Sequence, residues 1–97
     1  MVRPLVERRL RDVSQRLQRL REELEVTDEQ LAHLADEADD ARIRALVSET
    51  PTAERDHVEA AGHADAMRRH RASVQDEIAR LEQAQDDLLD RFQAGRA

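Results

Sequence analysis

The chain has 97 residues, which suits one domain, and 39% of them are charged whereas only Phe92 is aromatic. It contains no cysteine, which excludes disulfides and thiolate metal sites. The formal net charge is −6, and residues 26–66 hold eleven acidic residues against three arginines, which argues against nucleic-acid binding. No apolar run suggests a signal peptide or a membrane span, so we expect a cytoplasmic protein.

Residues 4–48 carry apolar or small side chains at alternating steps of four and three. This heptad pattern is typical of a helix that packs one seam against another helix. Pro4 suits the first turn of such a helix, where its missing N–H is not needed. We therefore expect a first helix over about residues 4–48, with a seam that comprises Val6, Leu10, Val13, Leu17, Leu20, Leu24, Thr27, Leu31, Leu34, Ala38, Ala41, Ala45 and Ser48.

A competing signal lies inside this helix at Thr27. Thr27 and Gln30 have the spacing of a capping box, and Val26 with Leu31 forms a hydrophobic staple, which together mark a helix start. The heptad phase nevertheless continues across this point, since Leu24 and Leu31 are seven residues apart. The continuity favours one helix, and a three-helix bundle with a break near Thr27 stays open as the alternative.

The clear break comes at residues 49–51. Thr50 followed by Pro51 is a good pair for the cap and the first residue of a helix, and Gly95 suits a helix end. We expect a second helix over about residues 51–93, in which Gly62 permits close approach of the helices. Its seam comprises Ala60, Ala64, Met67, Arg71, Val74, Ile78, Leu81, Gln85, Leu88 and Phe92.

Two helices of similar length around one short turn predict an all-α fold. We expect a long antiparallel two-helix hairpin, a coiled coil, that forms a single domain over residues 1–97. In this arrangement Leu20 faces Leu81 and Leu34 faces Met67, and small residues face one another near the turn. Such a hairpin has one layer of core, whereas ordering each residue costs about 1.5 kcal/mol. We therefore expect a homodimer that forms a four-helix bundle.

Apolar residues that lie off both seams gather near the turn, beside a run of carboxylates. They supply a second face at the tip of the hairpin. This face either completes the homodimer or receives a different, unidentified protein partner. The candidate partner-binding tip comprises Asp36, Glu37, Asp39, Asp40, Ile43, Leu46, Val47 and Val58.

Arginines gather at the opposite end of the predicted hairpin, where they alternate with carboxylates. We expect most of them to form ion pairs within and between the helices. Arg71 is the seam residue least suited to an apolar contact. We expect it to extend its charged end to solvent, to pair with Asp28 or Asp36, or to set the register of a dimer.

Residues that carry catalytic chemistry are scarce. The chain has no glycine-rich loop and no cysteine nucleophile, and a thin hairpin offers little concavity for a catalytic carboxylate pair. We therefore expect no enzyme activity, no cofactor and no metal. Glu54 and His57 form one copy of the Glu-x-x-His motif that di-iron bundles use twice, so a metal-binding helical bundle remains an alternative.

The two-helix plan and the Leu-, Arg-, Glu- and Ala-rich composition resemble small coiled-coil hairpin proteins of high-GC actinobacteria; all sixteen basic residues are arginine. The plan is also similar to secreted helical hairpins with a Trp-x-Gly turn, although the turn here is Glu49-Thr50-Pro51. The acidic tip resembles the finger of Gre-type transcription factors, which implies an acidic finger that regulates the transcription machinery. Our main expectation is a non-enzymatic protein-interaction module, an adaptor or regulator that acts through a self-associating hairpin. The acidic finger is the alternative.

Overall fold

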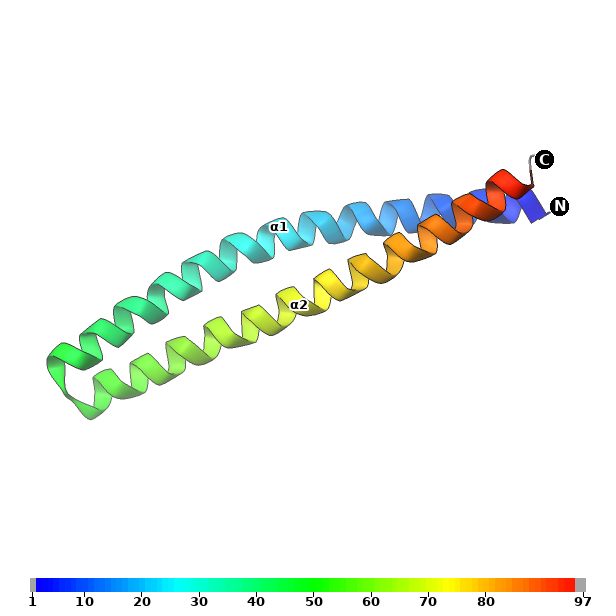
Figure 1. Ribbon diagram of the computed structural model, residues 1–97. Coiled ribbons are helices and arrows are strands. Elements are labelled where there is room, and N and C mark those ends of the chain that lie inside the picture. Colours follow the sequence, from blue (N-terminus) through cyan, green and yellow to red (C-terminus); the bar gives the residue numbers. More distant parts are fainter. Residues whose placement is uncertain (1, 96–97) are drawn as a thin grey trace. The chain divides into compact units, whose positions relative to one another are not determined.

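The computed structural model describes residues 2–95, with the side chain of Val2 left out. These residues form two α-helices, α1 (Val2–Ser48) and α2 (Pro51–Ala94), which run in opposite directions around a short turn (Figure 1). The prediction of an all-α antiparallel two-helix hairpin is confirmed. The alternative with a break near Thr27 is wrong, because α1 passes through Thr27 without interruption. The retained heptad phase outweighs the local capping signal.

The turn between the helices uses the residues that the capping pattern indicates. The backbone N–H of Ala53 donates a 3.1 Å hydrogen bond to Oγ1 of Thr50, which is the N-cap of α2. Glu49 has a φ of 52°, in the left-handed region, and its N–H donates to the carbonyl of Ala45 at 3.1 Å. A residue in the left-handed conformation commonly ends a helix, and this residue is usually glycine. Here Glu49 takes that place at the end of α1.

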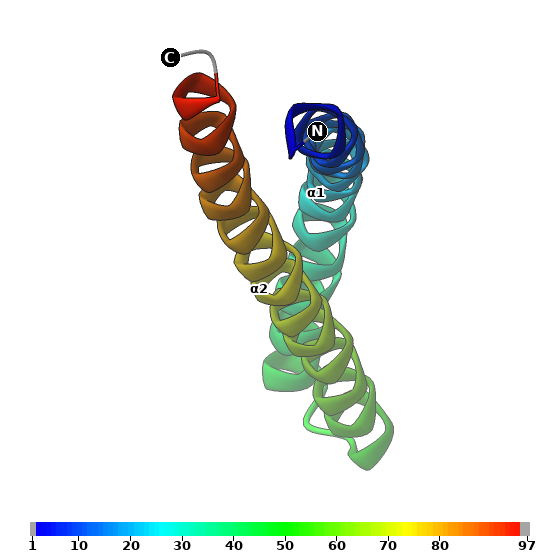
Figure 2. The same ribbon diagram turned by 90° about the vertical axis from the view of Figure 1, so that its right-hand side faces the viewer.

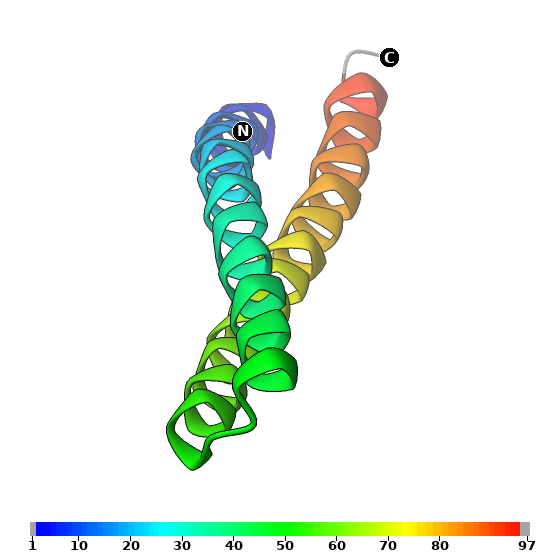
Figure 3. The same cartoon turned by 90° about the vertical axis from the view of Figure 1, so that its left-hand side faces the viewer.

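The chain divides into two compact units, which we describe separately. The terminal unit consists of residues 2–24 and 74–95 and includes the start of α1 and the end of α2 (Figure 2). The tip unit consists of residues 25–73 and includes the turn between the helices (Figure 3). Each unit contains one stretch of each helix and therefore has its own part of the seam.

The terminal unit has a core of large aliphatic side chains. Its buried residues are Val6, Leu17, Leu20, Val74 and Leu88, which all belong to the predicted seam. Polar contacts join the two helices beside this core. The side-chain amide of Gln85 donates to the Ser14 hydroxyl at 3.0 Å, and Arg16 donates two hydrogen bonds to Oε1 of Glu77, at 2.8 and 3.1 Å. Arg21 and Glu82 form a further ion pair at 3.5 Å.

The tip unit has a core of small residues. Ala41 and Ala64 are buried, and Thr27 is only 2% exposed. Arg71 forms the expected ion pair with Asp28. Gly62, in contrast, is exposed, and a Cβ atom at this position would meet no atom within 4 Å. The expectation that Gly62 permits close approach of the helices is therefore wrong, because it lies away from the contact between them.

Candidate functional site

Six residues near the end of α1 form a continuous stripe on the surface of the tip unit. Their spacing of three and four places them on one helix face, opposite the seam position of Ala41. All six side chains are exposed, and the exposed fraction of Val47 is 79%. The tip stripe comprises Asp36, Asp39, Asp40, Ile43, Leu46 and Val47.

The acidic side chains of the tip stripe have no ion-pair partners among the described residues. Among the described residues, Asp36, Asp39 and Asp40 make no ion pair and accept no side-chain hydrogen bond. Glu37 differs from them, because it lies 3.0 Å from Nε2 of His33 one turn earlier. Three carboxylates of the stripe are therefore available to a binding partner, whereas that of Glu37 already has a neighbour.

Val58 does not belong to the tip stripe. It lies on α2 and is 62% exposed. It precedes the buried Ala64 by six residues, which corresponds to a rotation of roughly 240° around the helix axis. Val58 therefore points away from the seam on its own helix. Of the eight predicted tip residues, α1 brings six together, and the other two, Glu37 and Val58, lie outside the stripe.

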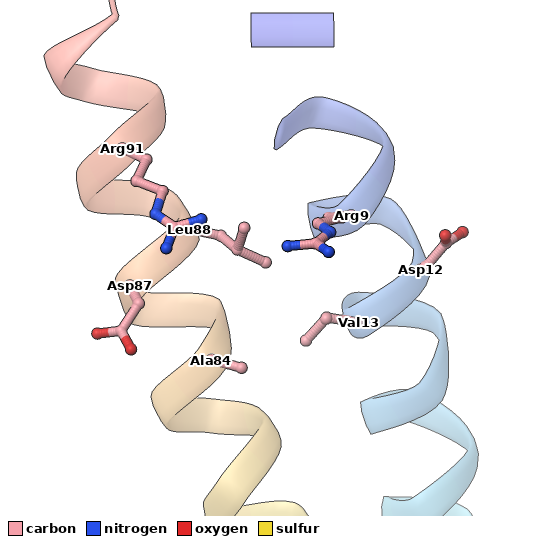
Figure 4. A pocket seen from close by; sticks show the side chains of 7 residues that line it. All are labelled: Arg9, Asp12, Val13, Ala84, Asp87, Leu88 and Arg91. Atoms are coloured by element: carbon pink, nitrogen blue, oxygen red, sulfur yellow. The ribbon is translucent and has the colours of Figure 1, made fainter. Parts of the chain in front are cut away.

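A second surface, which the sequence did not indicate, lies between the helices of the terminal unit. Two adjacent hollows of about 320 and 530 Å³ share Arg9, Asp12 and Arg91 as lining residues. Figure 4 shows the side chains of Val13 and Leu88 pointing toward each other in the first hollow. We name the two hollows together the end groove, which is lined by Leu5, Val6, Arg8, Arg9, Asp12, Val13, Ala84, Asp87, Leu88 and Arg91.

The end groove is cationic above an apolar floor. In Figure 4 the guanidinium groups of Arg9 and Arg91 extend toward the space between the helices, whereas the carboxylates of Asp12 and Asp87 point away from it. Asp87 accepts a hydrogen bond from the side-chain amide of Gln83 at 3.1 Å. Within residues 2–95, neither Arg9 nor Arg91 forms an ion pair or a side-chain hydrogen bond. The groove thus presents two unpaired positive charges beside exposed aliphatic atoms.

Two further residues complete the surroundings of the end groove. Arg8 lines its second hollow and also lacks an ion pair within the described chain. Arg3, in contrast, has neighbours, since its guanidinium carbon lies 4.9 Å from the ring centre of Phe92 and its Nε lies 3.6 Å from Glu7.

The heptad pattern predicts which residues face each other. It does not predict how far apart the two helices lie, so the groove has no simple sequence signal.

The four histidines differ in their exposure. His33, His63 and His70 are exposed, and His57 is half-buried on the seam side of α2. The Nδ1 atom of His57 is buried and has no hydrogen-bond partner in the described part of the chain. Over residues 2–95 the structure contains no group of three His, Cys, Asp or Glu side chains that is able to hold a metal ion. No observation therefore favours the metal-binding alternative.

The chain matches no protein-family model, no curated protein and no solved structure. In the described residues, neither helix has a stretch that is long and apolar enough to cross a membrane. The tip stripe and the end groove are the two surfaces described above that combine charge with exposed apolar atoms.

Proposed function

We propose that the protein is a non-enzymatic interaction module, an adaptor or regulator that acts through self-association of its helical hairpin. The observation that carries this proposal is the exposure of large aliphatic side chains. The described residues include seven buried hydrophobic residues and as many large hydrophobic residues that are 40% exposed or more. The exposed set comprises Leu5, Val26, Ile43, Leu46, Val47, Val58 and Leu89.

Burial of these side chains is a source of binding free energy. Complete burial of one Val, Leu or Ile side chain stabilises by about 1.5–3 kcal/mol relative to exposure. Ile43, Leu46 and Val47 lie side by side on the tip stripe, so one contact covers all three. The core inside the tip unit is made of small residues such as Ala41 and Ala64, which contribute less. A second protein surface on the stripe therefore adds a layer that the hairpin alone lacks.

Light scattering over a range of protein concentrations tests the proposal. We expect the mass to rise from that of one chain, 11.2 kDa, to that of a dimer. The thermal midpoint should rise with concentration as well, because unfolding is then coupled to dissociation. A chain that stays monomeric and folded, with a midpoint independent of concentration, contradicts self-association.

An acidic finger that contacts the transcription machinery is the second candidate function. The unpaired carboxylates of Asp36, Asp39 and Asp40 favour it, because they suit a basic partner surface. Binding of the chain to purified RNA polymerase tests this candidate. We expect replacement of the three aspartates by arginine to abolish binding, and equal binding of both chains contradicts the finger.

A further inference from the structure

The tip stripe and the end groove have complementary features. The stripe offers three unpaired carboxylates, from Asp36, Asp39 and Asp40, followed by three exposed aliphatic side chains. The groove offers three unpaired guanidinium groups, from Arg8, Arg9 and Arg91, around an apolar floor. Each surface therefore has the charge and the apolar area that the other requires.

We propose that the tip stripe of one copy of the chain docks into the end groove of a second copy. This inference rests on the proposed self-association and names the surfaces that carry it. The aspartates of the stripe pair with the arginines of the groove. The aliphatic side chains of Ile43, Leu46 and Val47 cover the half-buried Val13 and the exposed Leu5.

The unpaired charges are the first argument for a second copy. Arg16 and Arg21 of the same unit have acidic partners, Glu77 and Glu82 respectively. Arg9 and Arg91 have no such partner among the described residues, and both extend into the space between the helices (Figure 4). A carboxylate that enters this space is attracted by both positive charges. The stripe supplies carboxylates one helical turn apart, at Asp36 and Asp40.

The apolar atoms are the second argument. Ion pairs on an exposed surface contribute little, typically below about 1 kcal/mol each. The stripe and the groove both add apolar area beside the charges, and its burial supplies free energy and excludes water from the pairs. Leu46 is 66% exposed and Leu5 is 61% exposed, so both have most of their surface available.

Each copy contains one stripe and one groove. In the proposed dimer a two-fold axis relates the two copies, so that each stripe meets the groove of the other copy.

Charge reversal tests this contact directly. The groove variant carries Arg9→Glu and Arg91→Glu, and the stripe variant carries Asp36→Arg and Asp40→Arg. All four positions are exposed, so the fold should persist, which circular dichroism checks. We expect each variant alone to raise the dimer dissociation constant by about tenfold or more, since like charges then meet in both contacts.

A mixture of the two variants is the decisive measurement. The acidic groove of one variant then meets the basic stripe of the other, and the remaining groove and stripe keep their native charges. We therefore expect the mixture to form a heterodimer although neither variant pairs with itself. Arg55→Glu with Arg69→Glu is the matched control, because both arginines are exposed on α2 outside the groove. This control should dimerise like the wild type. With the stripe variant it keeps only one of the two complementary contacts, so it should pair with that variant more weakly than the groove variant does.

The outcomes separate this inference from the proposed function. If the groove variant dimerises as tightly as the wild type, the docking of stripe and groove is wrong while self-association stands. If the mixture contains no heterodimer, the docking is also wrong. If the wild type itself stays monomeric at all concentrations, both proposals fail.

Discussion

Arg71 on α2 donates a hydrogen bond through Nε to Oδ1 of Asp28 on α1, and this ion pair joins the two helices of the tip unit. The side chains remain 37% and 47% exposed, respectively. Water therefore screens the charges, and a pair of this kind contributes about 0.5 kcal/mol. Arg71 occupies a seam position through its aliphatic stem, while its charged end reaches the edge of the seam.

Substitution of Arg71 separates the stem from the charge. Arg71→Met keeps an unbranched apolar side chain and removes the charge, so we expect the free energy of unfolding to stay within about 0.5 kcal/mol of the wild type. Arg71→Ala removes the stem as well, and we expect a loss of about 1 kcal/mol. Urea titrations at one protein concentration measure both values. An equal loss in the two variants would show that the charge matters more than the stem.

Glu49 offers a way to stabilise the turn. Its φ of 52° is unfavourable for a residue with a side chain, by roughly 1 kcal/mol, and glycine adopts it freely. We expect Glu49→Gly to raise the free energy of unfolding by up to about 1 kcal/mol. Glu49→Ala is the control, because it keeps Cβ and should bring no gain. The urea midpoint distinguishes the two, and a gain from alanine alone would refute the explanation.

His57 contains a buried polar atom without a partner. Its Nδ1 finds no hydrogen bond among the described residues, and such an atom costs about 1–3 kcal/mol. We expect His57→Leu to raise the thermal midpoint, since leucine has no polar atom to bury. The matched control is His63→Leu at an exposed position of the same helix, where no gain should appear. If both variants behave alike, burial of Nδ1 is not the cause.

Gly62 leaves room for a side chain in the interior of α2. No atom lies within 4 Å of a Cβ built there, and alanine in a helix is about 1 kcal/mol more favourable than glycine. We expect Gly62→Ala to stabilise the protein by about this amount in a urea titration. Gly95→Ala, beyond the end of α2, is the control and should change little. Destabilisation by Gly62→Ala would indicate that this position contacts another surface, such as that of a second copy.

Much of the fold follows from the periodicity of the sequence. The buried residues Leu17, Leu20 and Ala41 in α1, and Ala64 and Leu88 in α2, all lie on the predicted seams. Heptad spacing fixes which face of a helix is buried, and the residues around Pro51 fix where the turn lies. Local capping signals are less informative, as Thr27 shows, because tertiary packing outweighs them.

The surfaces were less predictable than the seam. The spacing of Asp36, Asp39 and Ile43 places them on one face of α1, so most of the tip stripe is readable from the sequence. The sequence predicts Val58 as a tip residue because it lies near the turn, but it belongs to α2 and lies outside the stripe on α1. The end groove depends on the separation of the helices at Val13 and on side-chain conformations, which no spacing rule provides.

Continuity of α1 at Thr27 allows a sharp test with proline. If a helix began at Thr27, Asp28 would be its first residue, and proline would be tolerated there. Because α1 is uninterrupted, proline at this position removes a hydrogen bond and clashes with the preceding turn. We therefore expect Asp28→Pro to lower the free energy of unfolding by about 3 kcal/mol.

The control for this substitution is Asp28→Ala, which removes the ion pair with Arg71 but leaves the backbone hydrogen bond in place. It should cost less than about 1 kcal/mol, since the pair is partly exposed. Denaturant titrations of both variants give the difference, and circular dichroism shows whether helix is lost. If the proline variant were as stable as the alanine variant, α1 would consist of two helices, and the three-helix alternative would return.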